Sequence, residues 1–179
     1  MLRFSGKKLP SDEMKILKMA AKFTLDRHVS AHKQRKISIT VCLEDSPSGG
    51  WDGECSYVGL VRNKRVFDIR IRPFALINKR AKKPLVRLKN VIEVLMHELI
   101  HVKQYVNNEL FDYVNGDTKY DGRVYPLNEN ESYDEYWNSP WEIEAYGRVV
   151  GTFEMFLRHH GPEIDALYKK RRLRSDEQG

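Results

Sequence analysis

One five-residue stretch, His97-Glu98-Leu99-Ile100-His101, constrains this 179-residue chain more than any other feature of its sequence. It lies within Leu88–Val106, a segment whose apolar residues recur with helical spacing. Residues four apart lie on one face of an α-helix, so His97 and His101 can bind one metal ion together. Glu98 lies beside them, where its carboxylate can take a proton from a water that the metal activates. The stretch therefore predicts a metal site on a helix.

The helix that carries these residues is predicted to lie inside the protein. Its apolar side chains form a stripe along one face, and further apolar residues flank the two histidines on the other. A helix that is apolar on nearly all sides is buried. We therefore expect His97 and His101 to face a cleft or an interface; the competing interpretation is a pair of core histidines that bind no metal. The stripe consists of Leu88, Val91, Ile92, Leu95, Leu99, Val102 and Val106.

A helix and a small sheet are predicted before this segment. The sequence pattern predicts a helix over residues 11–25, capped by Ser11, then strands over residues 37–43, 56–61 and 66–72, with a loop over residues 45–50. In the last strand, Phe67, Ile69 and Ile71 alternate with polar neighbours, which is typical of a strand with one side in water. We expect a three-stranded, mostly antiparallel sheet with residues 66–72 at its edge.

A long excursion and two helices are predicted after it. Residues 107–138 are polar yet rich in aromatic side chains, so we expect an ordered segment packed against the body. Ser139 and Pro140 then open a helix, and His159-His160-Gly161-Pro162 is a stop signal that should end it near residue 158. A basic helix follows. The sequence thus predicts one α+β domain, with a core over about residues 11–160 and a basic tail over residues 163–179.

Composition is typical of a globular protein and sets few limits on partners. The 31 basic and 25 acidic side chains give a net charge of +6, which permits a weak nucleic-acid contact through the basic segments Lys79–Lys83 and Lys169–Arg174. Cys42 and Cys55 lack the spacing of a disulfide or zinc framework and are expected to be reduced thiols in the sheet. Without a signal-peptide pattern or a membrane-length apolar stretch, we expect a cytoplasmic protein with no membrane contact. The sequence does not indicate an oligomeric state.

A catalytic zinc ion usually has three protein ligands, so the predicted site needs one more. After His101, no histidine occurs before His159. Gln104 and Asn107 occupy the positions at which Gly and His would supply a third histidine close in sequence. The acidic side chains of the later helix therefore remain as candidates.

Helical geometry separates the two acidic candidates, Glu142 and Glu144. Glu142 shares its face with apolar residues such as Val149 and Phe153, whereas Glu144 shares its face with smaller and more polar residues. A carboxylate on a buried face is costly unless it is paired or bound to a metal. We therefore favour Glu142 as the third ligand and keep Glu144 as its substitute. The competing interpretation of Glu142 is a capping box with Ser139.

The motif His97-Glu98-Leu99-Ile100-His101, followed on a later helix by Glu142-Ile143-Glu144-Ala145, resembles the gluzincin group of zinc metallopeptidases. In that group, a glutamate on a second helix completes the zinc site. The stretch Pro140–Ala145 is also similar to small predicted metallopeptidases of tailed bacteriophages, which are loosely grouped with SprT-like proteins. The likeness covers roughly residues 66–156 of this chain.

This resemblance implies a zincin-like fold with a minimal gluzincin core, and Zn²⁺ bound by His97, His101 and Glu142. It implies a metalloendopeptidase-like hydrolase that acts on a peptide or protein substrate, with Glu98 as the general base. The predicted edge strand over residues 66–72 would then hold an extended peptide by strand addition. A phage-encoded protein of this kind would work in the cytoplasm of its host.

Two residues of this chain differ from those expected in these families, and the residue that would stabilise the oxyanion is not determined by the resemblance. Tyr146 stands where gluzincins commonly have an aspartate that bonds a zinc-binding histidine, and Gly116 stands where SprT-like proteins have a later histidine ligand. Tyr133, Tyr136 and Tyr146 are all candidates to stabilise the oxyanion. The alternative function is a non-catalytic protein in which the metal is structural or absent and the basic segments bind nucleic acid.

Overall fold

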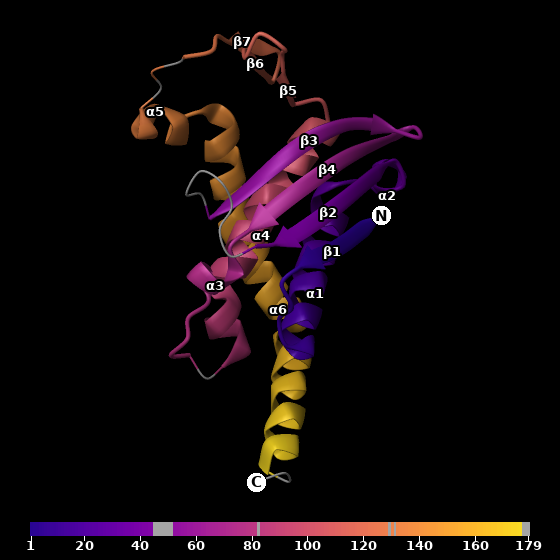
Figure 1. Ribbon diagram of the computed structural model, residues 1–179, viewed down its shortest axis with the longest axis vertical. Coiled ribbons are helices and arrows are strands. Elements are labelled where there is room, and N and C mark those ends of the chain that lie inside the picture. Colours follow the sequence, from indigo (N-terminus) through magenta and orange to yellow (C-terminus); the bar gives the residue numbers. More distant parts are fainter. Residues whose placement is uncertain (45–51, 82, 129, 131, 177–179) are drawn as a thin grey trace.

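A four-stranded sheet and three long helices form the body of the molecule (Figure 1). The computed structural model describes residues 1–44, 52–81, 83–128, 130 and 132–176, so the predicted loop over residues 45–50 lies outside the described part. The helices are α1 (Ser11–His28), α2 (Ala31–Gln34), α3 (Pro73–Leu76), α4 (Pro84–Val106), α5 (Tyr133–Trp137) and α6 (Pro140–Asp176). The strands are β1 (Leu2–Gly6), β2 (Ile37–Leu43), β3 (Gly53–Val61), β4 (Lys64–Ile71), β5 (Leu110–Asp112), β6 (Thr118–Tyr120) and β7 (Arg123–Tyr125). The predicted α+β class is confirmed.

The main sheet contains the three predicted strands and one that was not predicted. Its order is β1-β2-β4-β3; β1 and β4 both run parallel to β2, and β3 is antiparallel to β4. The predicted mostly antiparallel pairing of these strands is therefore wrong. Strand β1 has apolar side chains only at Leu2 and Phe4, too few for an alternation to be recognised in the sequence. The parallel pairing depends on contacts between segments far apart in the chain, which local patterns do not encode.

Strand β4 lies inside the sheet, and β3 forms its edge, so the edge position predicted for residues 66–72 is wrong. Phe67, Ile69 and Ile71 of β4 are fully buried, and the polar residues between them point to the opposite face of the sheet. A strand with one solvent-exposed face and a strand at the edge of a sheet show a similar alternation of apolar and polar residues in sequence. The β3–β4 hairpin closes with positive φ angles at Arg62 (48°) and Asn63 (62°), as a two-residue type I′ turn requires.

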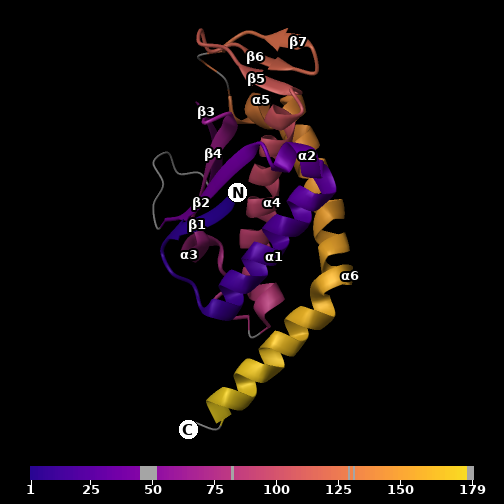
Figure 2. The same cartoon turned by 90° about the vertical axis from the view of Figure 1, so that its right-hand side faces the viewer.

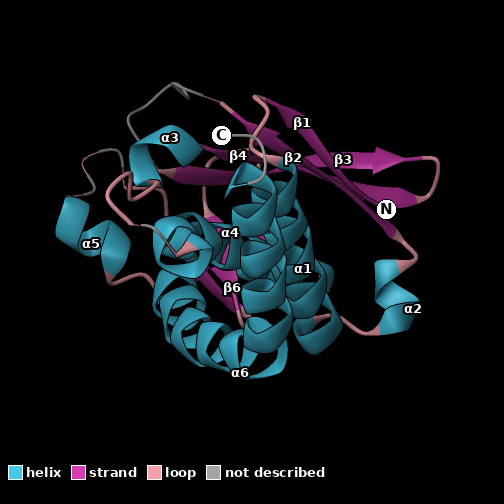
Figure 3. Cartoon of the chain, turned by 90° about the horizontal axis from the view of Figure 1, so that it is seen from below, coloured by secondary structure: helices cyan, strands magenta, loops and turns pink. Residues whose placement is uncertain are grey.

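The core lies between the sheet and the long helices, which pack together on one side of the sheet (Figure 3). Helix α4 contacts both the sheet and α6, and α1 packs beside it. The predicted apolar stripe of α4 is fully buried except for Val106, and each of its large side chains contributes roughly 1.5–3 kcal/mol to folding. The core also includes Leu9 and Ile164, which lie outside the range of about 11–160. Cys42 and Cys55 are free thiols in β2 and β3.

The segment over residues 107–138 is ordered, as predicted, in its described part. Strands β5, β6 and β7 form a small antiparallel sheet, and α5 follows with a capping box between Ser132 and Glu135. The β6–β7 turn has positive φ angles at Asp121 (46°) and Gly122 (83°), in agreement with the Asp-Gly turn signal. This small sheet lies beyond the end of α4, at the top of the molecule in Figure 1.

Helix α6 is continuous from Pro140 to Asp176, so the stop predicted at residues 159–162 is wrong. Gly161 is not among the described glycines with positive φ, and the helix therefore lacks the left-handed cap that the Gly-Pro signal suggested. Pro162 lies inside the helix. A proline within a helix can bend the helix without ending it when the residues beyond the proline are packed against the core. Ile164 supplies that packing because it is buried in the core. Figure 2 shows α6 bending along its length.

The predicted cap of α1 is displaced by one residue. Ser11 is the first helical residue, and Pro10 precedes it at the cap position without a side-chain hydrogen bond. Within the predicted basic segments, Lys82 and the side chains of residues 170–174 lie outside the described part of the structure. No helix in the part of the chain that the structure describes is both long and apolar enough to cross a membrane.

Candidate metal centre

His97, His101 and Glu142 converge at the contact between α4 and α6. The two histidines lie one turn apart on α4, and their Nε2 atoms are 3.0 Å from each other. Glu142, in the first turn of α6, places Oε2 3.0 Å from His97 Nε2 and Oε1 3.4 Å from His101 Nε2. The three residues are buried, with exposed fractions of 8%, 8% and 2%. The structure thus brings together the three residues that the sequence predicted as ligands.

These distances fit a single metal ion. Ligand atoms about 2.0–2.2 Å from a tetrahedral zinc ion lie roughly 3.3–3.5 Å from one another. Glu142 Oε2 has no hydrogen bond of acceptable geometry among the described residues, although His97 Nε2 is 3.0 Å away. The two histidine nitrogens and the Glu142 carboxylate therefore lie close enough together to share one ion. Among the described His, Cys, Asp and Glu side chains, these three residues are the group of three or more that could hold a metal ion.

The charges in the group also suit a divalent cation. Burial lowers the pKa of His97 and so favours the neutral imidazole that a metal requires. Burial alone would lower the pKa of His101, but its close contact with the Glu142 carboxylate and the charge on Glu98 outweigh burial, and the pKa is raised. Burial would raise the pKa of Glu142, yet its close contacts with the two histidines hold that pKa below its usual range. Glu142 is thus an anion, and a bound cation would compete with protons for the histidine nitrogens.

Glu98 lies beside this group with an environment that suits a general base. Its side chain is buried, and burial, the largest influence, raises its pKa to about 7 against the opposing charge of His101. A general base works best when its pKa lies near the working pH. Gly53 of β3 packs directly over this carboxylate: a Cβ atom at Gly53 would lie 2.7 Å from Glu98 Oε1 and 2.5 Å from Val94 Cγ1. A side chain at residue 53 would therefore displace Glu98.

Glu144, the substitute ligand, lies outside the converging group. Its carboxylate is bound by Lys103 and Arg148 and accepts hydrogen bonds from Gln104 and Tyr120. The capping-box interpretation of Glu142 is also not observed, because Ser139 Oγ is buried without a hydrogen-bond partner in the described structure. The geometry therefore favours Glu142 over Glu144 as the third ligand.

The three candidate tyrosines differ in their relation to the site. The Tyr136 hydroxyl donates a hydrogen bond of 2.8 Å to Glu142 Oε1. The ring of Tyr146 packs against the ring of His97 with centroids 4.4 Å apart, so an aromatic contact occupies the place of the aspartate expected from the gluzincin pattern. Tyr133 is exposed and packs against Trp137. Tyr136 is thus the candidate whose hydroxyl group contacts a ligand directly.

Two cavities meet at the candidate centre. One, of about 400 Å³, extends from the ligands toward β3, β5 and β6. The other, of about 750 Å³, is lined by aromatic residues of α5 and by apolar residues of α6, among them Trp137 and Val149. Both cavities are bordered by Gly53, His97 and Glu98, so a molecule bound across these residues would reach both.

Sequence patterns did not identify Gln104 and Gly53 as parts of the site. Gln104 lies three residues after His101, a spacing that places the two side chains on one helical face and could have indicated the contact. The role of Gly53 depends on the docking of β3 against α4 and has no local signal. Comparison of the chain with protein-family models, curated proteins and solved structures found no match. The assignment of the residues that could hold a metal therefore rests on the sequence pattern and on their geometry.

Proposed function

We propose that this protein is a zinc-dependent metallopeptidase that hydrolyses bonds in a peptide or protein substrate. The observation that supports this most is the convergence of His97, His101 and Glu142 on one point, with the buried Glu98 beside it. Two histidines and one carboxylate form a common ligand set of hydrolytic zinc sites. The resemblance to gluzincin and SprT-like peptidases of phages supports the same assignment, including a zincin-like fold.

In the proposed reaction, each protein group has a defined task. A zinc ion in this site would lower the pKa of a water molecule and polarise the scissile carbonyl group. Glu98 takes the proton of the attacking water and later returns it to the leaving amine. Tyr136 holds the Glu142 carboxylate through its hydroxyl hydrogen bond. The burial of Glu98 keeps its proton affinity high enough for the first transfer.

The edge strand β3 is the proposed binding strand for the substrate. Among the described strands, none pairs with its outer edge, and its Gly53 end lies against Glu98. An extended peptide can add to such an edge through backbone hydrogen bonds. The peptide would then cross the point at which the two cavities meet. Because β4 lies inside the sheet, the proposed binding strand is β3 instead of residues 66–72.

Zinc analysis and a hydrolysis assay test the proposed function together. We expect the purified protein to hold one zinc ion per chain, and His97→Ala to hold much less. Labelled casein should be cut, chelation should stop the cutting, and added zinc should restore it. Absence of stoichiometric zinc in the wild-type protein would contradict the proposal. Zinc-independent, salt-sensitive binding to DNA would instead favour the nucleic-acid alternative.

Gly53→Ala is expected to slow hydrolysis without removing zinc. The added methyl group would displace the Glu98 carboxylate, since its Cβ would lie 2.7 Å from Oε1. A displacement of about 1 Å in a reacting group can reduce the rate about 10²-fold. The measurement is kcat beside zinc content. Gly151→Ala on α6 is the matched control, because a Cβ there meets nothing within 4 Å. Equal kcat in Gly53→Ala and wild type would show that β3 does not position Glu98.

A further inference from the structure

Gln104 is a fully buried amide in direct contact with a candidate ligand. Its Oε1 lies 2.8 Å from His101 Nδ1. Its Nε2 donates two hydrogen bonds of 2.9 Å, one to the backbone carbonyl of Trp141 and one to Glu144 Oε2. All the polar atoms of the amide are thus engaged.

These contacts determine which way the amide points. A backbone carbonyl and a carboxylate can only accept hydrogen bonds, so the NH₂ group of Gln104 must face Trp141 and Glu144. Its carbonyl oxygen must then face His101, and His101 Nδ1 must carry a hydrogen and donate it. In the neutral imidazole, the lone pair is consequently on Nε2, the atom that faces His97 and Glu142.

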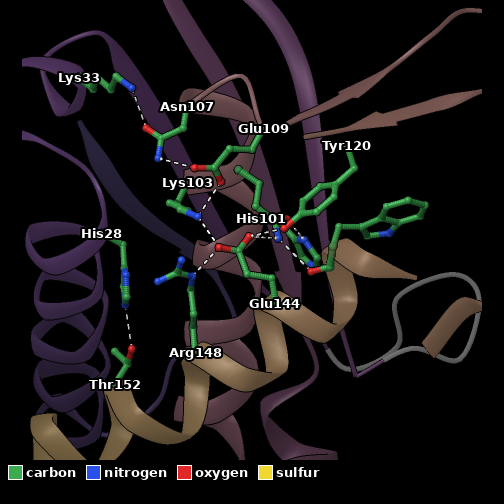
Figure 4. A network of polar contacts seen from close by, with 12 residues as sticks. His28, Lys33, His101, Lys103, Asn107, Glu109, Tyr120, Glu144, Arg148 and Thr152 are labelled. Atoms are coloured by element: carbon green, nitrogen blue, oxygen red, sulfur yellow. Dashed lines mark hydrogen bonds and ion pairs between the residues drawn. The ribbon is translucent and has the colours of Figure 1, made fainter. Parts of the chain in front are cut away.

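Glu144 in turn is fixed by a network that spans several elements (Figure 4). Glu144 Oε1 lies 2.5 Å from both Lys103 Nζ of α4 and Arg148 Nε of α6, and the Tyr120 hydroxyl of β6 donates to Oε2 at 2.9 Å. Lys103 is itself buried, with a side-chain exposure of 7%, and also binds Glu109 at 2.6 Å. A buried lysine with two carboxylates fixes them more firmly than an exposed pair would.

The same network determines how α6 meets α4. Glu144 follows Glu142 by two residues on α6 and is bound to Lys103 and Gln104 on α4. The Trp141 carbonyl, one residue before Glu142, is bound to Gln104 as well. Contacts on both sides of Glu142 therefore hold the first turn of α6 at a fixed position along the histidine helix.

We propose that Gln104 and Glu144 are positioning residues of the metal centre: Gln104 holds His101 in the tautomer whose Nε2 faces the metal, and Glu144 fixes both that amide and the helix turn that presents Glu142. The inference rests on the metal centre of the proposed function. It assigns the two glutamates of Glu142-Ile143-Glu144 separate tasks. His97 Nδ1 has no partner among the described residues, so the positioning acts on one histidine of the pair.

The tautomer can be measured directly in the metal-free protein. Nitrogen-15 NMR of histidine-labelled protein, at a pH at which His101 is neutral, should show hydrogen on Nδ1 of His101. Gln104→Met, which keeps the shape and removes the acceptor, should give a mixture of tautomers. Hydrogen on Nε2 in the wild type would overturn the inference. This readout is independent of zinc and of catalysis, so it also decides the inference if the wild-type protein holds no zinc.

Zinc affinity supplies the second measurement. Gln104→Met is expected to bind zinc about 10–100-fold more weakly in competition with a chromophoric chelator, the usual loss when a partner of a ligating histidine is removed. Gln34→Met, at a glutamine hydrogen-bonded to Leu25 and Val29 far from the site, is the matched control. Equal zinc affinity in Gln104→Met and wild type would overturn the inference and leave the proposed metal centre intact.

Discussion

Glu98→Gln is expected to retain zinc and to lose hydrolysis by about 10²–10⁴-fold, the usual contribution of a general base. The substitution keeps the size of the side chain, and Glu98 does not belong to the three residues that converge as ligands. A neutral amide cannot take the proton of the attacking water. The measurements are kcat and zinc content, with Glu154→Gln at an exposed position of α6 as the control. Retained hydrolysis in Glu98→Gln would remove Glu98 as the base.

The same substitution has a predicted effect on stability in the metal-free protein. Burial raises the folded-state pKa of Glu98 to about 7, above its usual value of 4.5. Between these two values the folded protein binds more protons than the unfolded chain, so the Glu98 contribution to stability falls as the pH rises through this range. Glu98→Gln lacks this titration and should be more stable than the wild type at pH 8, by roughly 3 kcal/mol. Urea unfolding of both proteins at several pH values measures the difference.

The histidine part of the site could be predicted because its information is local. His97 and His101 are four residues apart on one helix, and the apolar stripe from Leu88 to Val102 made the burial of that helix evident. Glu142 required one further step: a carboxylate on an apolar helix face needs a partner. The sequence could not show that Glu144 forms a salt bridge with Lys103 and accepts a hydrogen bond from Gln104, because these contacts form only when α6 docks on α4.

The errors share a physical origin in contacts between distant segments. Strand β1 forms through parallel pairing with β2. Strand β4 is interior because β3 pairs with the edge of β4 that faces away from β2. At Pro162, the local stop signal is overruled by the burial of Ile164 one half-turn later. Local patterns thus predicted where the three long helices and three strands of the main sheet form, whereas pairing, edge position and the length of α6 depended on packing.

The two glutamates of α6 should differ sharply when each is replaced by glutamine. Glu142→Gln removes a charged ligand and is expected to weaken zinc binding beyond the 10–100-fold loss typical of a residue that only orients a ligand. Glu144→Gln should stay within that range, because it keeps the shape of the network and Lys103 retains Glu109 as a partner. Both substitutions preserve volume, so the comparison isolates charge and ligation from packing.

Competition with a chelator measures both affinities, and the visible spectrum of the cobalt-substituted protein reports whether the ligand set has changed. Glu142→Gln should alter that spectrum, because the Glu142 oxygens lie 3.0 and 3.4 Å from the two histidine nitrogens and would coordinate the same ion. Glu144→Gln should leave the spectrum close to that of the wild type, because Glu144 reaches His101 only through Gln104. The opposite order of affinities would make Glu144 the ligand and would require α6 to dock on α4 in a different register. A loss of equal size in both variants would mean that the network contributes as much to zinc binding as the ligand itself.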